Sequence, residues 1–278
     1  MITDRAFLQT VLDHPEENVP RLIYADWLEE QGECARAEFI RLQCGGDDPP
    51  RQQHLLEQYG PVWASPVFRH GYRYHFRRGF IEEVALQART LLEYGEQLFH
   101  QAPIRLLRII GAQGLIGRLT QMPQLGRLRA LHLTGCSIGD EGVELLSGCR
   151  FLTELKTLRL GTNALTDRGV EMLIESPHLH QLQTLVLRDN LIGDLGALLL
   201  AGTNQWPNLQ SLDVSDNLIG DAGTTALAHS SKLRSLHKLD ISLQFKGYGI
   251  RPPDLIENAS PAINTSTKRR HSYSAMRN

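Results

Sequence analysis

Apolar residues along this chain follow two spacings in alternation. Leu158 and Leu160 are separated by a single residue, whereas Val170 and Leu173 recur at helical spacing shortly afterwards. Alternation puts every second side chain on one face of a strand, and a spacing of three or four puts side chains on one face of a helix. The pattern therefore predicts a short strand followed by a helix.

This strand–helix unit recurs with a fixed period. Copies begin 27 residues apart, at Leu128, Leu155, Leu182, Leu209 and Leu236. Stacked repeats form parallel strands about 4.8 Å apart on one side and thicker helices on the other, so the stack curves with its strands inside. We predict an α/β solenoid shaped as a horseshoe, with a concave parallel sheet and convex helices.

Two polar positions recur with the same period. The first follows each strand and contains Cys136, Asn163, Asn190 and Asn217. A short side chain there can hydrogen-bond backbone groups of the buried turn, so we expect a structural ladder. The second lies two residues before a glycine and contains Asp140, Asp167, Asp194 and Asp221. We expect each of these carboxylates to cap the helix that follows it.

Residues 128–241 resemble the leucine-rich repeats of the ribonuclease-inhibitor type. They share the pattern L-x-x-L-x-L-x-x-N/C-x-L followed by D-x-G. Members of that class are protein-binding horseshoes, including inhibitors of nucleases and activators of a small GTPase. This chain departs from the longer alternating repeats of the inhibitors, and no motif matches the arginine-centred site of the activators. The resemblance implies protein binding, and neither specific activity is carried over.

The amino-terminal part has the pattern of short amphipathic helices. We expect helices over residues 2–13, from after Asn18 to Gly32, and from near Ala35. The expected core contains Leu22, Ile23, Trp27, Leu28, Phe39, Ile40 and Leu42. Tyr24 and Trp27 share one helix face, opposite Glu29 and Glu30, which indicates core packing; a docking surface is the alternative.

The run RLIYADWLEEQGECARAEFIRLQ resembles the bacterial repeat-companion domain, a module found ahead of leucine-rich repeats. That family has no established activity, so the resemblance implies architecture. Strands near residues 80–86 and 107–109, with a helix over 90–101 between them, look like divergent repeats. We expect a helical domain (1–66), an N-terminal cap with divergent repeats (67–126), 27-residue repeats (127–243) and a disordered tail (244–278), the repeat pattern failing after Ile241.

Side chains between the strand leucines should face out of the concave sheet, where a partner would bind. The candidate partner-binding residues are Arg108, Arg129, His132, Lys156, Arg159, Arg188, Asp189, Asp213, Asp216 and Asp240. They make the face basic at its amino-terminal end and acidic at its carboxy-terminal end. Such a groove would orient a partner with complementary charges, although each single residue is also explained as a solvated strand position.

The charge balance and the cysteine and histidine positions indicate no further kind of binding site. Lys and Arg number 29 against 31 Asp and Glu, so no net field favours nucleic acid or an anionic membrane. The four cysteines show no disulfide or zinc-ligand spacing, and the H-x-H of His178 and His180 has no further ligand nearby. We expect no secretory signal, no membrane-spanning segment, no metal or cofactor, and a cytoplasmic location.

Three classes of function remain. We expect a protein-binding scaffold, not an enzyme and without a small-molecule substrate, because every repeated feature builds a surface and none assembles an active site. The alternative is a regulator of a partner enzyme, of the inhibitor or GTPase-activator type. A nucleic-acid role, through the groove or the basic residues 268–271, ranks third.

Overall fold

The structure is a computed structural model, and it describes residues 4–46, 48–64 and 73–244. Within them the strands are β1 (Arg73–Arg77), β2 (Phe80–Gln87), β3 (Leu106–Ile110), β4 (Ala130–His132), β5 (Thr157–Arg159), β6 (Thr184–Val186), β7 (Ser211–Asp213) and β8 (Lys238–Asp240). They form one eight-stranded sheet in chain order. Strand β1 runs antiparallel to β2, and every later pair is parallel.

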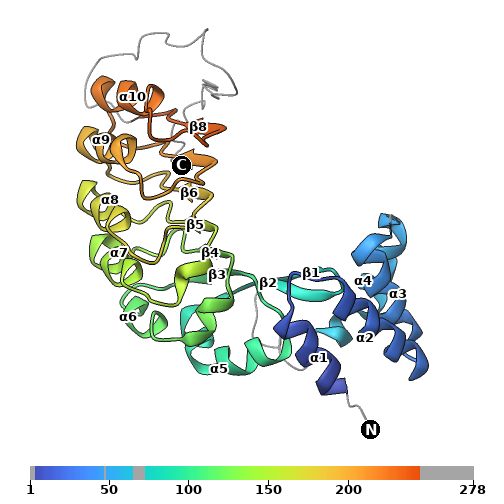
Figure 1. The fold of residues 1–278 in the computed structure, drawn as a ribbon. Coiled ribbons are helices and arrows are strands. Elements are labelled where there is room, and N and C mark those ends of the chain that lie inside the picture. Colours follow the sequence, from blue (N-terminus) through green and yellow to red (C-terminus); the bar gives the residue numbers. More distant parts are fainter. Residues whose placement is uncertain (1–3, 47, 65–72, 245–278) are drawn as a thin grey trace, which may run out of the picture.

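Helices cover the outer side of this sheet (Figure 1). They are α5 (Ala88–Gln101), α6 (Ile116–Leu119), α7 (Gly139–Ser147), α8 (Asp167–Ile174), α9 (Asp194–Gly202) and α10 (Asp221–Ala228), with 3-10 turns η2 (Pro123–Arg127) and η3 (Leu152–Glu154). The strands line the inner side of the curve (Figure 1). This arrangement confirms the predicted α/β solenoid with a concave sheet.

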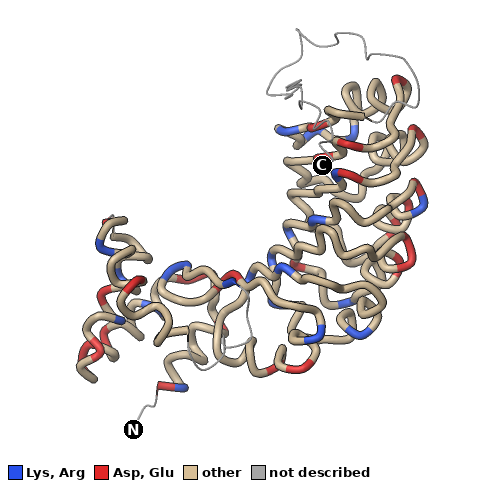
Figure 2. The backbone as a smooth tube through the Cα atoms, turned by 180° about the vertical axis from the view of Figure 1, so that it is seen from behind, with Lys and Arg blue, Asp and Glu red and all other residues tan. Residues whose placement is uncertain are grey.

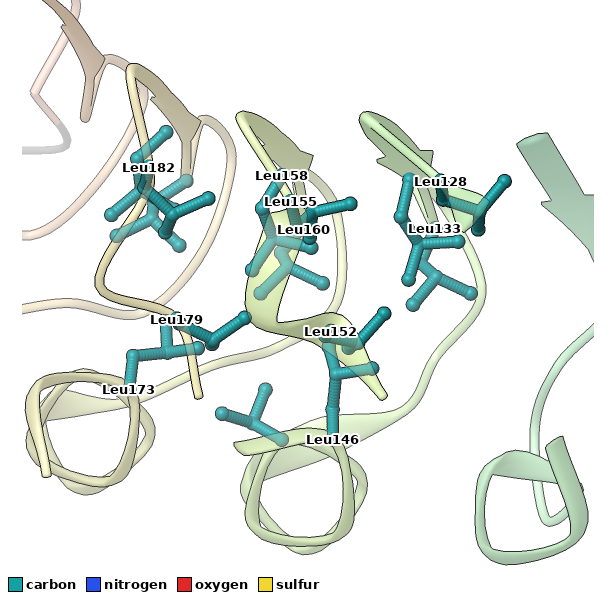
Figure 3. Packing of buried hydrophobic residues seen from close by; sticks show 14 of the residues in the cluster. Leu128, Leu133, Leu146, Leu152, Leu155, Leu158, Leu160, Leu173, Leu179 and Leu182 are labelled. Atoms are coloured by element: carbon teal, nitrogen blue, oxygen red, sulfur yellow. The ribbon is translucent and has the colours of Figure 1, made fainter. Parts of the chain in front are cut away.

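Stacked leucines form the core of the solenoid. The middle strand residues Leu131, Leu158, Leu185, Leu212 and Leu239 pair in register from β4 to β8. Leu158 and Leu160 are fully buried, and Leu146 and Leu152 reach the same core from the helical side (Figure 3). Because each repeat buries its leucines against the next, the stack is stabilised by neighbour contacts.

The predicted asparagine ladder is present. Asn190 donates from Nδ2 to the carbonyls of Leu160 (3.1 Å) and Leu187 (2.8 Å). Its Oδ1 accepts from the backbone N–H groups of Asn163 and Leu165, both at 3.0 Å. One amide side chain thus satisfies backbone groups of two repeats that would otherwise be buried without partners.

The ladder continues one step further than expected. Gln244 lies 27 residues after Asn217. Its Oε1 accepts from the backbone N–H groups of Asn217 and Ile219, both at 3.2 Å, and its Nε2 donates to the Val214 carbonyl at 2.8 Å. The prediction that the repeat pattern fails after Ile241 is wrong at this position, because the longer glutamine side chain reaches the groups that asparagine serves elsewhere.

Three of the recurring aspartates, Asp140, Asp167 and Asp194, cap the helix of the following repeat and not their own. Asp167 is the first residue of α8, but its Oδ1 accepts from the backbone N–H groups of Gly193 (2.7 Å) and Gly196 (2.9 Å) at the start of α9. Asp194 does the same for Gly220 and Gly223, both at 2.8 Å. The predicted capping role is therefore right in chemistry and wrong in its target, since a residue inside the first turn points toward the neighbouring helix.

The amino-terminal module contains α1 (Asp4–Asp13), α2 (Val19–Glu30), α3 (Cys34–Gly45) and α4 (Pro49–Trp63). Helix α4 was not predicted. Its aromatic end packs on the rest of the protein through Trp63, whose ring lies 5.1 Å from that of Phe39 and 6.4 Å from that of Phe76 in β1. Asp48 caps its start by accepting from the Arg51 N–H at 2.9 Å.

The predicted core of this module is partly wrong. Leu22 and Ile23 are 37% and 50% exposed. The buried stripe of α2 contains Arg21, Tyr24, Ala25 and Leu28, at the spacing of one helix face. A charged residue occupies a stripe position because Arg21 pairs with Glu82, 2.7 Å away, and this turns the two apolar neighbours outward.

No helix within the described ranges is both long and apolar enough to cross a lipid bilayer.

Candidate interaction surface

One row of side chains crosses the concave face in strict register. From β3 to β8 it contains Arg108, His132, Arg159, Val186, Asp213 and Asp240. Residues opposite each other on neighbouring strands point to the same face. We call this set the central row. Its composition changes from basic to acidic along the solenoid, as the sequence predicted.

The central row also extends into the amino-terminal hairpin. Arg73 in β1 pairs with Ala85 in β2, and Ala85 pairs with Arg108 in β3. Arg73 is exposed, while its neighbours Tyr74 and Phe76 are partly buried against the opposite side. The sequence analysis did not identify Arg73, because its position in the row depends on the pairing of β1 with β2, which the repeat pattern does not predict.

The basic part of the surface divides into paired and unpaired cations. Among the described residues, Arg108, Lys156 and Arg159 are exposed and have no carboxylate within ion-pair distance. Arg129 instead contacts Glu16 at 3.2 Å and Glu154 at 2.9 Å. The first three are therefore free to meet an anion, and Arg129 is not.

His132 differs from the other candidates because it is almost covered, at 7% exposure. It lies between Arg108 and Arg159 in the central row. Burial, together with the charges of Arg159 and Arg108, lowers its pKa to about 4. His132 is therefore neutral near pH 7 and adds no positive charge to the surface.

The acidic part is largely occupied by contacts within the chain. Asp213 accepts from the Ser215 hydroxyl, and Asp240 accepts from the Ser242 hydroxyl, both at 2.6 Å.

Asp189 and Asp216 follow their strands in the left-handed region, at φ +58° and +54°. Asp189 accepts from Thr162 at 2.9 Å, and Asp216 pairs with Arg188 at 2.7 Å. These two contacts link neighbouring repeats. Only Asp216 and Arg188 neutralise each other, because a hydroxyl donor leaves the negative charge of Asp189, Asp213 and Asp240 in place.

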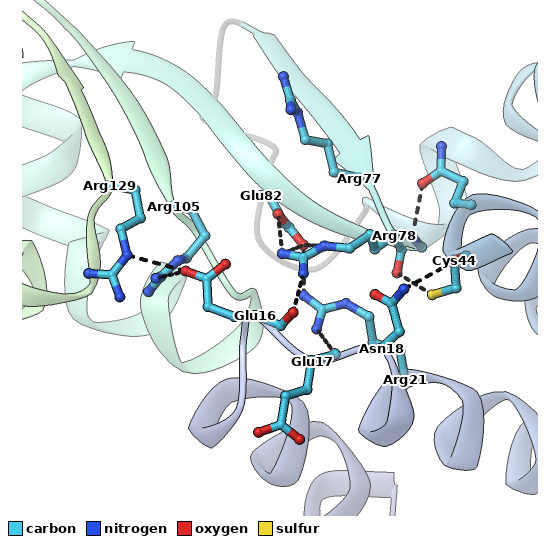
Figure 4. A network of polar contacts seen from close by, with 12 residues as sticks. Glu16, Glu17, Asn18, Arg21, Cys44, Arg77, Arg78, Glu82, Arg105 and Arg129 are labelled. Atoms are coloured by element: carbon cyan, nitrogen blue, oxygen red, sulfur yellow. Dashed lines mark hydrogen bonds and ion pairs between the residues drawn. The ribbon is translucent and has the colours of Figure 1, made fainter. Parts of the chain in front are cut away.

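A polar network joins the helical module to the first strands (Figure 4). Glu16 lies between Arg105 and Arg129 and pairs with both. Burial alone would raise the pKa of Glu16, but hydrogen bonds and charges from the two arginines outweigh it and lower the pKa. Glu82 pairs with Arg21 and with Arg78, at 2.7 and 2.9 Å.

A groove of about 610 Å³ opens beside this network, between α3 and the β1–β2 hairpin. The four arginines that line it are Arg77, Arg78, Arg105 and Arg129. Each is paired with a carboxylate of Glu83, Glu82 or Glu16. The two Glu16 pairs connect the helical module to the residues just before β3 and β4, whereas the other two pairs lie within the β1–β2 hairpin.

The chemistry of a metal site is not assembled in the described part of the chain. No group of three or more His, Cys, Asp or Glu residues there could hold a metal ion. His178 is half-buried and His180 exposed, in the segment between α8 and β6.

Comparisons with known proteins bear on the repeats. Residues 128–147, 151–173, 178–201 and 207–228 match the family model described as "Leucine Rich repeat". A comparison with curated proteins gave no match. Among solved structures, the chain is similar to one titled "Crystal structure of TLR13-ssRNA13 complex", with 18% identity and a TM-score of 0.30. That match covers 58% of this chain and 28% of the other, so the chain spans less than a third of the neighbour's length. The four matched segments fall on the units from β4 to α10: leucine-rich repeats are present, and they build the α/β solenoid of this protein.

Proposed function

We propose that this chain is a scaffold that binds another protein through the concave face of its sheet. The observation that carries the proposal is the central row, in which side chains from six successive strands stand in register and Arg108 and Arg159 are exposed. Leucine-rich repeats generally mediate protein–protein interaction. A rigid curved sheet suits this role because little ordering entropy is lost on binding.

The same proposal includes the absence of catalysis and of a cofactor. The most regular polar residues, such as Asn190 and Asp167, are used in hydrogen bonds between repeats. A polar group committed to buried backbone partners is not available to a substrate. We therefore propose a protein partner, with no small-molecule substrate and no membrane attachment.

We also propose the repeat type, a bacterial origin and a cytoplasmic location for the protein. The 27-residue period and the Asn/Cys ladder support repeats of the ribonuclease-inhibitor type, and the run 21–43 supports a bacterial repeat-companion module. The four cysteines are free thiols, which fits the reducing cytoplasm.

Site-specific photo-cross-linking tests the proposal. A photoreactive residue replaces Val186 in the central row or, as the matched control, Leu198, which is 48% exposed on α9. A protein cross-linked from position 186 and not from 198 would support concave binding. Cross-links from position 198 alone would refute it.

A regulator of an enzyme is a narrower form of the same function. If the cross-linked partner is a nuclease or a GTPase, its turnover with and without this chain distinguishes a regulator from a passive scaffold. If nucleic acid and not protein is cross-linked to position 186, a nucleic-acid-binding role is favoured.

A further inference from the structure

The unpaired cations of the central row have a regular spacing. Arg73 lies in β1, Arg108 in β3 and Arg159 in β5, so each is separated from the next by two strand intervals. Neighbouring strands lie about 4.8 Å apart, which places the three backbone positions roughly 9.6 Å apart. Ala85 and the neutral His132 occupy the strands between them. Three like charges therefore stand in line with uncharged residues between them.

These arginines lack the internal partners that neutralise other cations of this face. Among the described residues, Arg77, Arg129 and Arg188 each contact a carboxylate, and Arg73, Arg108 and Arg159 do not. All three are exposed. Figure 2 shows that several Lys and Arg positions lie along the inner edge of the bend, together with some acidic positions. Unpaired cations held in line on a rigid sheet attract an anionic partner.

We propose that Arg73, Arg108 and Arg159 bind an acidic, extended segment of the partner protein, with a carboxylate at every third residue. This inference rests on the proposed function and names the chemistry of the partner. A polyproline II segment repeats every three residues, about 9.3 Å, which matches the spacing of the arginines. Side chains at i, i+3 and i+6 of such a segment lie on one face and reach the three guanidinium groups in turn.

The rest of the central row favours a short peptide over a nucleic acid. Beyond Arg159 the row continues through Val186 to Asp213 and Asp240. A nucleic-acid strand that ran on along the row would bring its phosphates against these carboxylates, at a cost in affinity. The binding segment is therefore limited to the strands from β1 to β5.

Fluorescence anisotropy with the full chain tests this proposal. The probe is a labelled peptide of four Glu-Pro-Pro units. Its control has the same composition with the four glutamates together, and a twelve-residue uridine oligonucleotide tests the alternative. We expect the spaced peptide to bind most tightly and to be released by salt, because exposed ion pairs are screened.

Charge-reversal variants locate the contact. Arg108→Glu and Arg159→Glu should each weaken the spaced peptide about fivefold or more, since an ion pair is replaced by repulsion. Arg89→Glu is the matched control, because Arg89 is exposed on the outer helix α5 and its reversal changes net charge equally. Arg108→Gln removes the charge without reversing it and is less disruptive to folding. It should weaken peptide binding by less than Arg108→Glu does.

The pKa of His132 gives an independent measure of peptide binding. Carboxylates placed beside Arg108 and Arg159 oppose two of the causes that keep its pKa low, so bound peptide should raise that pKa in an NMR titration. The proposal is wrong if Arg89→Glu weakens peptide binding as much as the other reversals do, or if the oligonucleotide binds more tightly than the spaced peptide. It is also wrong if the pKa of His132 does not change when the peptide is bound. If no acidic peptide binds while cross-links from position 186 persist, this inference fails and the concave scaffold stands.

Discussion

Replacing Asp167 by alanine should destabilise the helix of the following repeat. The Asp167 carboxylate accepts from the N–H groups of Gly193 (2.7 Å) and Gly196 (2.9 Å), two of the backbone donors that the start of α9 cannot satisfy itself. Loss of a capping side chain costs about 1 kcal/mol, and loss of a negative charge near a helix N-terminus costs up to about 1 kcal/mol more. We therefore expect a loss of about 2 kcal/mol in the free energy of unfolding.

Native-state hydrogen exchange shows which helix is affected. A local loss of about 2 kcal/mol speeds exchange of the Gly193 and Gly196 amides by roughly 30-fold. The amides of α8, the helix that contains Asp167, should keep their protection. Urea denaturation gives the matching change in global stability.

Asp167→Asn is the matched control, because it retains an oxygen at the accepting position and removes only the charge. It should lose less than half as much stability as the alanine variant. Faster exchange in α8 with unchanged Gly193 and Gly196 would refute capping between repeats. A loss below about 0.5 kcal/mol would refute the magnitude, since surface substitutions commonly stay within that range.

Substitutions at four other residues should also change the stability of the fold. Gly196→Ala should lower the urea midpoint, because the added Cβ would lie 2.6 Å from an Asp167 oxygen. Asn190→Ala should cost about 3 kcal/mol in urea denaturation, since two buried backbone N–H groups lose their acceptor. The pKa of Glu16 is lowered, so the stability it contributes is present above its ordinary value of 4.5 and is lost as pH falls through the lowered pKa; Glu16→Gln should remove that part of an acid-unfolding curve. His132 stays neutral in the folded chain down to about pH 4 but takes up a proton near pH 6.5 when unfolded, so stability should decline as pH falls between these values, and His132→Gln should flatten the decline.

Much of the architecture is readable from the amino-acid sequence because the repeats share one environment. The leucine equivalent to Leu158 has the same kind of neighbours in each repeat, so the 27-residue period predicts strand, turn and helix together. The same period places His132, Arg159 and Asp213 in one row, since equivalent positions stack in register. The asparagine ladder follows for the same reason.

The contacts of the candidate surface could not be predicted in this way. Several of them join side chains about one repeat apart in sequence, such as Thr162 with Asp189 and Arg188 with Asp216, which meet only when the repeats are stacked. Arg188 therefore looks free in the sequence but is neutralised by Asp216 from the next repeat, and Asp167 caps a helix it precedes by a full repeat. Arg73 joins the central row only through the pairing of β1 with β2, a hairpin outside the repeat pattern. Periodic burial is local and leaves a trace in the sequence, whereas charge pairing between elements depends on the geometry that their packing creates.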